Sequence, residues 1–167
     1  MVKSESRLCP GGSIAIGGGY ELECIKKSRR GNLLIEDLKH IWEASVRASH
    51  HFLTEEDILH LLPEVEGGLR YVDILLVVKT GDNQVGFMGV QDSKIEMLFL
   101  APCCFRMGIG RKLVLYAFEK FDVEFVDVNE QNPAGIAFYE SMGFKAFKRN
   151  EFDGEGRPFP ILEMKRG

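Results

Sequence analysis

The stretch IEMLFLAPCCFRMGIGRKL, residues 95–113, joins an apolar run to a pair of glycines and then to a helical pattern. The apolar run is typical of a strand, and apolar residues from Ile109 to Phe121 recur at helical spacing. A helix start leaves backbone N–H groups unpaired and carries a partial positive charge. Because Gly108 and Gly110 let that backbone approach a ligand closely, the stretch predicts a phosphate-type anion loop between a strand and a helix.

Three basic side chains, Arg106, Arg111 and Lys112, surround this loop in a chain whose net charge is −4. The loop departs from the dinucleotide fingerprint because Leu113 stands where the third glycine belongs, although Asp127 lies at a suitable distance for a ribose contact. It also lacks the lysine followed by Ser or Thr that a P-loop needs after its second glycine. The loop alone therefore leaves two interpretations open, a phosphate site or a glycine turn that packs a helix on a sheet.

The bulk composition is that of a globular domain. The 167 residues are 45% hydrophobic and 28% charged, which favours one domain with a sizeable core. We expect residues 1–19 to form a flexible glycine-rich extension and residues 20–167 to form the domain. The net charge gives no support for a nucleic-acid partner, and no apolar run approaches the ~20 residues of a membrane span.

The four cysteines show no Cys-x-x-Cys spacing. Cys103 and Cys104 are neighbours, and neighbours seldom bridge because the linkage strains the backbone. We interpret all four as small buried hydrophobic residues in a reducing compartment, which predicts a cytoplasmic protein.

Local patterns predict an alternation of strands and helices. Thr54 and Asp57 form a capping-box pattern, while Asn132 and Pro133 begin, and Gly143 ends, another helix. The predicted strands cover 20–28, 71–79, 84–92, 94–102, 124–129, 144–149 and 158–166, and the predicted helices cover 35–49, 54–65, 109–121 and 132–143. The order β-α-α-β-β-β-α-β-α-β-β predicts an α/β (α+β) fold with a mixed sheet.

Two segments carry a family resemblance. MLFLAPCCFRMGIGRKLVLYAF (97–118), followed by VDVNEQNPAGIAFYESMGF (126–144), resembles the GNAT superfamily of acyl-CoA-dependent N-acetyltransferases. The resemblance extends over nearly all of residues 20–166, and WEASVRASHHFLTEEDI (42–58) is similar to a group of small bacterial members. It implies a GNAT-like sheet and transfer of acetyl from acetyl-CoA to a primary amine. Phe105 departs from the family, which usually has Gln or Arg there, and so removes one side-chain contact to the pyrophosphate.

The resemblance also implies where the cosubstrate binds. The pyrophosphate would sit on residues 107–112, and the pantetheine arm would run beside the strand that ends at Leu100. Asn129 and Asn132 can hydrogen-bond the pantetheine amides, although Asn132 also suits a plain helix cap. The implied cofactor-binding residues are Leu98, Phe99, Leu100, Arg106, Met107, Gly108, Ile109, Gly110, Arg111, Lys112, Asn129, Asn132 and Tyr139.

Acetyl transfer to an amine needs a proton acceptor and a proton donor. A lysine-type amine has a pKa near ~10.4, so it arrives protonated, and the departing thiolate needs a proton. The resemblance implies that Tyr139 is the acid, and it lies about two turns after Asn132 on the same helix face. On pattern alone, an aromatic residue packed between helix and sheet is the alternative.

Two carboxylates are candidates for the base. Asp127 shares a strand face with Asn129, and Glu96 shares one with Leu98 and Leu100, as strict alternation predicts. We place Asp127 slightly ahead of Glu96; each also suits a solvated strand end, and in many relatives ordered water replaces a dedicated base.

The remaining interpretations concern the acceptor. Adjacent side chains diverge, so His50 and His51 predict no metal site, and we expect no metal cofactor. Their loop, with the acidic residues 55–57, either shapes an acceptor site for a cationic amine or complements a helix dipole. The acceptor is a small-molecule amine, a protein lysine or a protein N-terminus. The alternatives are a non-catalytic CoA-binding or regulatory module and, less favoured, another nucleotide-binding domain; monomer and homodimer both stay open.

Overall fold

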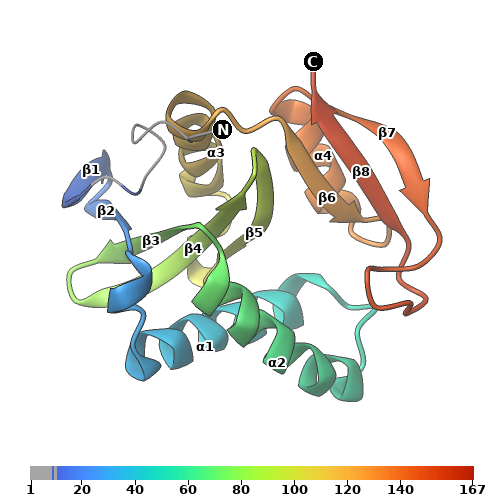
Figure 1. Ribbon diagram of the computed structural model, residues 1–167, viewed down its shortest axis with the longest axis horizontal. Coiled ribbons are helices and arrows are strands. Elements are labelled where there is room, and N and C mark those ends of the chain that lie inside the picture. Colours follow the sequence, from blue (N-terminus) through green and yellow to red (C-terminus); the bar gives the residue numbers. More distant parts are fainter. Residues whose placement is uncertain (1–8, 10) are drawn as a thin grey trace.

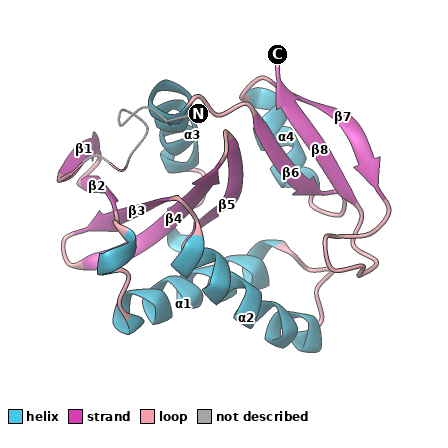
Figure 2. Cartoon of the chain, viewed as in Figure 1, coloured by secondary structure: helices cyan, strands magenta, loops and turns pink. Residues whose placement is uncertain are grey.

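The structure, a computed structural model, describes residue 9 and residues 11–167, and it contains one mixed sheet with helices on both faces (Figures 1 and 2). The strand order in the sheet is β1-β2-β3-β4-β5-β6-β8-β7, and only β5 and β6 pair in parallel. The strands are β1 (Ser13–Gly17), β2 (Tyr20–Cys24), β3 (Ile74–Thr80), β4 (Asn83–Gln91), β5 (Lys94–Leu100), β6 (Phe125–Asn129), β7 (Phe144–Asn150) and β8 (Ile161–Arg166). The helices are α1 (Asn32–Ser49), α2 (Glu55–Tyr71), α3 (Ile109–Phe121) and α4 (Pro133–Ser141), with short 3-10 turns η2 (Lys27–Arg29) and η3 (Pro102–Cys104).

The sheet is buried on both faces, which explains the apolar run in β3. Leu75 and Val77 pack with α1 and α2 on one face, while Ile74, Leu76 and Val78 pack with α3 on the other. All five are buried, so alternate residues enter two different cores. Burial of each such side chain stabilises the fold by about 1.5–3 kcal/mol, and the two cores hold the helices against opposite faces.

The sheet opens between β5 and β6. These strands pair only at Lys94 with Phe125 and at Ile95 with Val126, and they diverge from there toward their carboxyl ends (Figure 1). Beyond the two pairs, β6 continues to pair with β8, and β5 continues to pair with β4. A wedge-shaped gap in the hydrogen bonding thus separates the two halves of the sheet.

A β-bulge at Glu96 accompanies this opening. Ile95 lies opposite Val90 and Met97 lies opposite Gly89, so Glu96 is the extra residue on β5. The bulge breaks the alternation of faces. Strict alternation therefore no longer assigns the face of Glu96, and the prediction that it shares a face with Leu98 and Leu100 stays a prediction.

The same bulge changes which side chains share a core. Ile95 packs in the α3-side core with Leu98 and Leu100, whereas Met97 and Phe99 pack on the α1 side. Strict alternation would have placed Ile95 and Leu98 on opposite faces.

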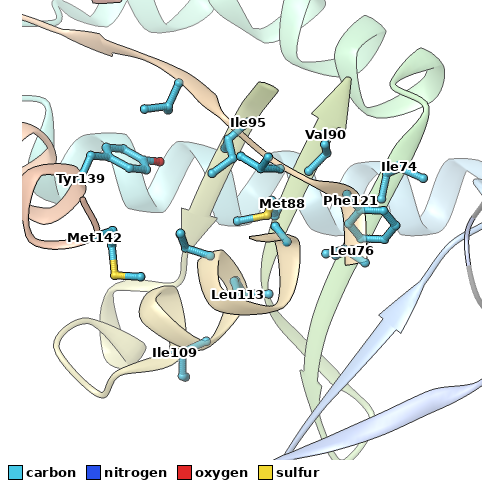
Figure 3. Close-up of a cluster of buried hydrophobic side chains, with 14 of the residues drawn as sticks. Ile74, Leu76, Met88, Val90, Ile95, Ile109, Leu113, Phe121, Tyr139 and Met142 are labelled. Atoms are coloured by element: carbon cyan, nitrogen blue, oxygen red, sulfur yellow. The ribbon is translucent and has the colours of Figure 1, made fainter. Parts of the chain in front are cut away.

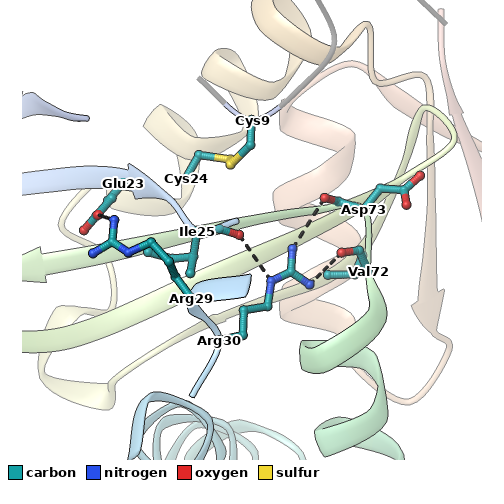
Figure 4. The surroundings of a disulfide bond; sticks show 8 residues. All are labelled: Cys9, Glu23, Cys24, Ile25, Arg29, Arg30, Val72 and Asp73. Atoms are coloured by element: carbon teal, nitrogen blue, oxygen red, sulfur yellow. Dashed lines mark hydrogen bonds and ion pairs between the residues drawn. A yellow bond between two sulfur atoms is a disulfide. The ribbon is translucent and has the colours of Figure 1, made fainter. Parts of the chain in front are cut away.

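The sheet begins earlier than the sequence indicated. Residues 13–17, within the predicted extension 1–19, form β1, which pairs antiparallel with β2. Cys9 and Cys24 form a disulfide with Cα atoms 5.5 Å apart (Figure 4), so the interpretation of these two cysteines as free thiols is wrong. Spacing along the chain gave no sign of it, because the hairpin brings the two residues together. Residues 1–8 and 10 of the predicted extension lie outside the described residues.

The predicted elements agree with the structure except at some ends. Helix α3 has the predicted bounds, and the capping box of Thr54 and Asp57 is present with hydrogen bonds of 2.8 and 3.1 Å. Helix α2, however, runs through Pro63 and continues to Tyr71, so the prediction of a strand that begins at Tyr71 is wrong. Gly68 lets this last part approach β5, since an added Cβ would lie 3.2 Å from the sulfur of Met97.

Arg30 joins the end of α2 to the chain after β2. Its side chain is buried, and its guanidinium donates to backbone carbonyl oxygens at 2.7–3.4 Å (Figure 4). The acceptors are Ile25, Leu69, Arg70, Val72 and Asp73. These bonds satisfy carbonyls that a helix end leaves unpaired, and they fix the start of β3.

We expect Arg30→Met to destabilise the fold by about 3 kcal/mol, because the carbonyl oxygens around it lose a charged donor while the apolar stem is kept. Urea unfolding should show a lower midpoint with an unchanged slope. Arg29→Met is the control, since the Arg29 side chain is 68% exposed and forms one 3.4 Å ion pair with Glu23. Equal midpoints for the two variants would contradict this role for Arg30.

Candidate active site

A cavity of about 770 Å³ occupies the gap where β5 and β6 part. Its walls come from β5, β6, the start of α3, helix α4 and the end of α1. The lining residues predicted from the sequence are Glu96, Leu98, Phe99, Leu100, Arg106, Gly108, Ile109, Gly110, Arg111, Asp127, Asn129, Asn132 and Tyr139. The fold thus gathers all three predicted catalytic residues and most of the predicted cofactor residues into one cavity.

The start of α3 forms one end of this cavity. Gly108 is the N-cap with φ of 80°, a left-handed conformation that favours glycine, and no side chain caps the helix. At Gly110, an added Cβ would meet the Phe138 ring at 3.4 Å, an ordinary contact. The first backbone N–H groups of α3 therefore stay available to an anion in the cavity, reinforced by the helix dipole.

The three basic side chains predicted to surround the loop, and Met107 within it, have different positions. Arg106 and Arg111 line the cavity. Lys112 instead donates to the carbonyl oxygen of Ile16 in β1 at 2.5 Å, and Met107 is 53% exposed, outside the lining. The hairpin of β1 and β2, which the sequence did not reveal, thus engages Lys112.

Tyr139 is buried on α4, with its ring edge against Phe144 at 5.7 Å between centroids. Its hydroxyl points away from α4 toward the sheet, in the direction of Ile95 (Figure 3). Burial raises the pKa of Tyr139, so the phenol stays protonated at neutral pH and can donate a proton. Within the described chain, no side chain or backbone group hydrogen-bonds this hydroxyl. Tyr139 therefore packs in the core and also lines the cavity, a position compatible with both interpretations, and its role as the acid stays a prediction.

The two carboxylates differ in their surroundings. Asp127 forms an ion pair of 2.6 Å with Lys94. Burial raises the pKa of Glu96, the ammonium of Lys94 opposes that shift, and the nearby carboxylates of Asp127 and Asp92 add to it. A carboxylate with a raised pKa is the better proton acceptor, and this favours Glu96 over the order expected from the sequence.

Asn129 and Asn132 hold the turn between β6 and α4. The Asn129 side-chain oxygen accepts from the Gln131 N–H at 2.9 Å, and that of Asn132 accepts from the Gly135 N–H at 3.1 Å. The cap role of Asn132 is therefore confirmed. Both residues line the cavity, and their amide NH₂ groups are the donors left for a ligand.

The acidic residues 55–57 have structural partners. Glu55 forms a bidentate pair with Arg47 at 2.6 Å for each bond, and Asp57 completes the capping box of α2. None of the three lines the cavity. Their positions match the helix-dipole interpretation.

His50 belongs to the loop that the sequence offered as a border of an acceptor site, and it lines the cavity. It follows α1 as the C-cap, and its ring lies 6.3 Å from that of Phe99 on β5. Burial, together with the neighbouring His51, lowers the pKa of His50. Ser45 and Ser49, one helical turn apart at the end of α1, line the cavity beside it.

Within the described part of the chain, no group of three or more His, Cys, Asp or Glu residues is placed to hold a metal ion. The helices described here include none that is long and apolar enough to cross a membrane.

Comparison with known proteins agrees with this geometry. The Acetyltransferase (GNAT) domain family matches residues 72–146. Peptidyl-lysine N-acetyltransferase YjaB of Escherichia coli (strain K12) is 36% identical over 129 residues, which cover 77% of this chain and 88% of the relative. The solution structure of apo YjaB superposes with a TM-score of 0.75 at 32% identity, covering 87% of this chain and 96% of that one. A GCN5-related N-acetyltransferase from Rhodopseudomonas palustris, 18% identical, has the same fold with a TM-score of 0.69, covering 87% and 94%.

The chain belongs to the GNAT family of acetyltransferases. The predicted family and the mixed α/β fold are confirmed, and the protein is an N-acetyltransferase that transfers an acetyl group to an amine.

We expect Glu96→Gln to raise the stability of the free protein at neutral pH. When folding raises the pKa of a carboxyl group above its ordinary 4.5, the folded protein becomes less stable as the pH increases from the ordinary pKa to the raised one. The gain from Glu96→Gln should therefore be full above that interval and vanish below pH 4.5. Thermal unfolding at several pH values measures it; a gain that is the same at every pH would contradict the raised pKa.

Proposed function

We propose that this acetyltransferase uses acetyl-CoA bound across the gap between β5 and β6. The diphosphate would lie on the backbone N–H groups at the start of α3, between Arg106 and Arg111. The pantetheine arm would run along β5, whose edge toward β6 is unpaired beyond Ile95, and reach Tyr139. The observation that carries the proposal is the uncapped N-terminus of α3 at one end of the cavity.

The chemistry follows from the residues at the centre of the cavity. Bound acetyl-CoA supplies the thioester. As the C–S bond breaks, the Tyr139 hydroxyl is placed to protonate the departing sulfur. Glu96 accepts a proton from the amine nitrogen, directly or through water, while Asp127 holds Lys94 beside it.

We propose a lysine side chain of a protein as the acceptor. The support is that both YjaB relatives, from Escherichia coli and Salmonella typhimurium, are named peptidyl-lysine N-acetyltransferases and are 36% identical to this chain. The net charge of −4 suits a basic acceptor better than a nucleic acid. A panel of lysine peptides and small amines, with thiol detection, tests this choice.

The compartment we propose is the cytoplasm, because an enzyme that consumes acetyl-CoA must work where that cosubstrate is supplied. The Cys9–Cys24 disulfide counts against this compartment, since cytosolic glutathione keeps most thiols reduced.

Gly110→Glu should weaken acetyl-CoA binding at least about tenfold, because a carboxylate would stand where the diphosphate binds. Gly110 can take a side chain without backbone strain, since its φ lies outside the left-handed region. Leu115→Glu adds the same charge to the same helix at a position that is 46% exposed, and it is the control. Calorimetry measures both affinities; an unchanged affinity for Gly110→Glu would refute the proposed diphosphate site.

Tyr139→Phe should lower kcat about 100-fold while acetyl-CoA binding stays near that of the native protein, since only the donated proton is lost. Thiol release gives kcat and calorimetry gives the affinity. Tyr116→Phe removes the same atom from a tyrosine on α3 that does not line the cavity, and it should leave both values unchanged. A native kcat for Tyr139→Phe would exclude the acid role.

A further inference from the structure

A second end of the cavity lies across the sheet from the start of α3. There the carboxyl end of α1 contributes Ser45, Ser49 and His50 to the lining. Helices α1 and α3 pack on opposite faces (Figure 1). If acetyl-CoA enters from the α3 end, as in the proposed function on which this inference rests, an acceptor amine reaches the thioester from the α1 end.

Hydrogen bonds fix the tautomer of His50. The Ser49 hydroxyl donates its single proton to the Ser45 carbonyl oxygen at 2.7 Å, because a carbonyl can only accept. The Ser49 oxygen also lies 2.7 Å from Nδ1 of His50, so in this second bond it must be the acceptor. Nδ1 therefore carries the hydrogen of the neutral ring, and Nε2 keeps its lone pair.

The surroundings keep this ring neutral. Its ring neighbours are Phe52, at 5.5 Å between centroids, and Phe99, at 6.3 Å. The titratable groups near it are His51 on its own segment and Glu96 on the facing strand β5, which lines the same cavity. Burial lowers the pKa of His50, which agrees with a neutral ring at pH 7.

We propose that Nε2 of His50 binds the acceptor ammonium and removes its first proton. A neutral imidazole at the acceptor end of the cavity is suited to that step, because an N–H of the ammonium can donate to the lone pair of Nε2 and then transfer its proton there. His50 is then a catalytic residue in addition to Tyr139 and Glu96.

The protons balance with these three groups. The ammonium gives one proton to His50, and the free amine attacks the thioester carbon to form the N–C bond. When the C–S bond breaks, Tyr139 protonates the sulfur and Glu96 takes the second proton from nitrogen. The Glu96 proton returns to the tyrosinate and the His50 proton passes to solvent, so each turnover releases one proton.

The test compares two acceptors in His50→Gln. With a lysine peptide, kcat/KM should fall about 100-fold. With a matched peptide that carries an aminooxy group, neutral at pH 7, the loss should be at most about fivefold, because no first proton has to be removed. Equal losses with both acceptors, or no loss, would overturn the role of His50. His40→Gln, at an exposed position of α1, is the control and should change neither value.

A measurement on the unaltered protein covers the case in which His50→Gln does not fold. Nitrogen NMR at pH 7 should show the His50 ring neutral with hydrogen on Nδ1, and adding the lysine peptide should shift Nε2. A charged ring or hydrogen on Nε2 would overturn the inference. If the native protein acetylates no lysine peptide, the proposed acceptor fails, and the tautomer result and a small-amine acceptor still decide the role of His50.

Discussion

The parting of β5 and β6 after two residue pairs is the constraint on which the rest of the structure depends. If β5 and β6 stayed paired along their whole length, backbone hydrogen bonds would join them and leave no space for a ligand between them. Here β6 instead keeps its pairing with β8, and the bulge at Glu96 bends β5 away. The cavity therefore passes between two halves of one sheet, with a different set of helices at each end.

This arrangement assigns different physical roles to the two ends. The start of α3 offers backbone donors and a positive dipole end, which suit an anion. The end of α1 offers backbone acceptors and, in the tautomer inferred for His50, a neutral imidazole with a free lone pair, which suit an ammonium group. In the proposed function, the electrostatic contrast between the two helix termini would give the cavity a direction, from the acyl donor to the amine.

The titratable side chains at the centre of the cavity differ in their tendency to bind a proton, because the fold gives each a different degree of burial and different charged neighbours. Tyr139 is enclosed by aromatic rings and stays protonated, whereas Glu96 at the bulge faces the cavity and has a raised pKa. Asp127, two residues from Asn129 on β6, is neutralised by Lys94 across the only stretch where β5 and β6 pair. The ion pair therefore reinforces the joint from which the strands diverge.

The sequence by itself determined the family, the order of elements from β2 onward, the bounds of α3 and the residues that end α4, because each follows from local periodicity, capping or a motif of adjacent residues. It also named the loop and the tyrosine that the fold brings into one cavity. Only the tertiary structure decided the β1 hairpin with its disulfide, the extension of α2 to Tyr71, the ion pair of Asp127 and the tautomer of His50. The hairpin with its disulfide, the end of α2 and the ion pair of Asp127 depend on partners far away in the chain, which no local pattern encodes, and the tautomer of His50 depends on the exact side-chain geometry at the end of α1.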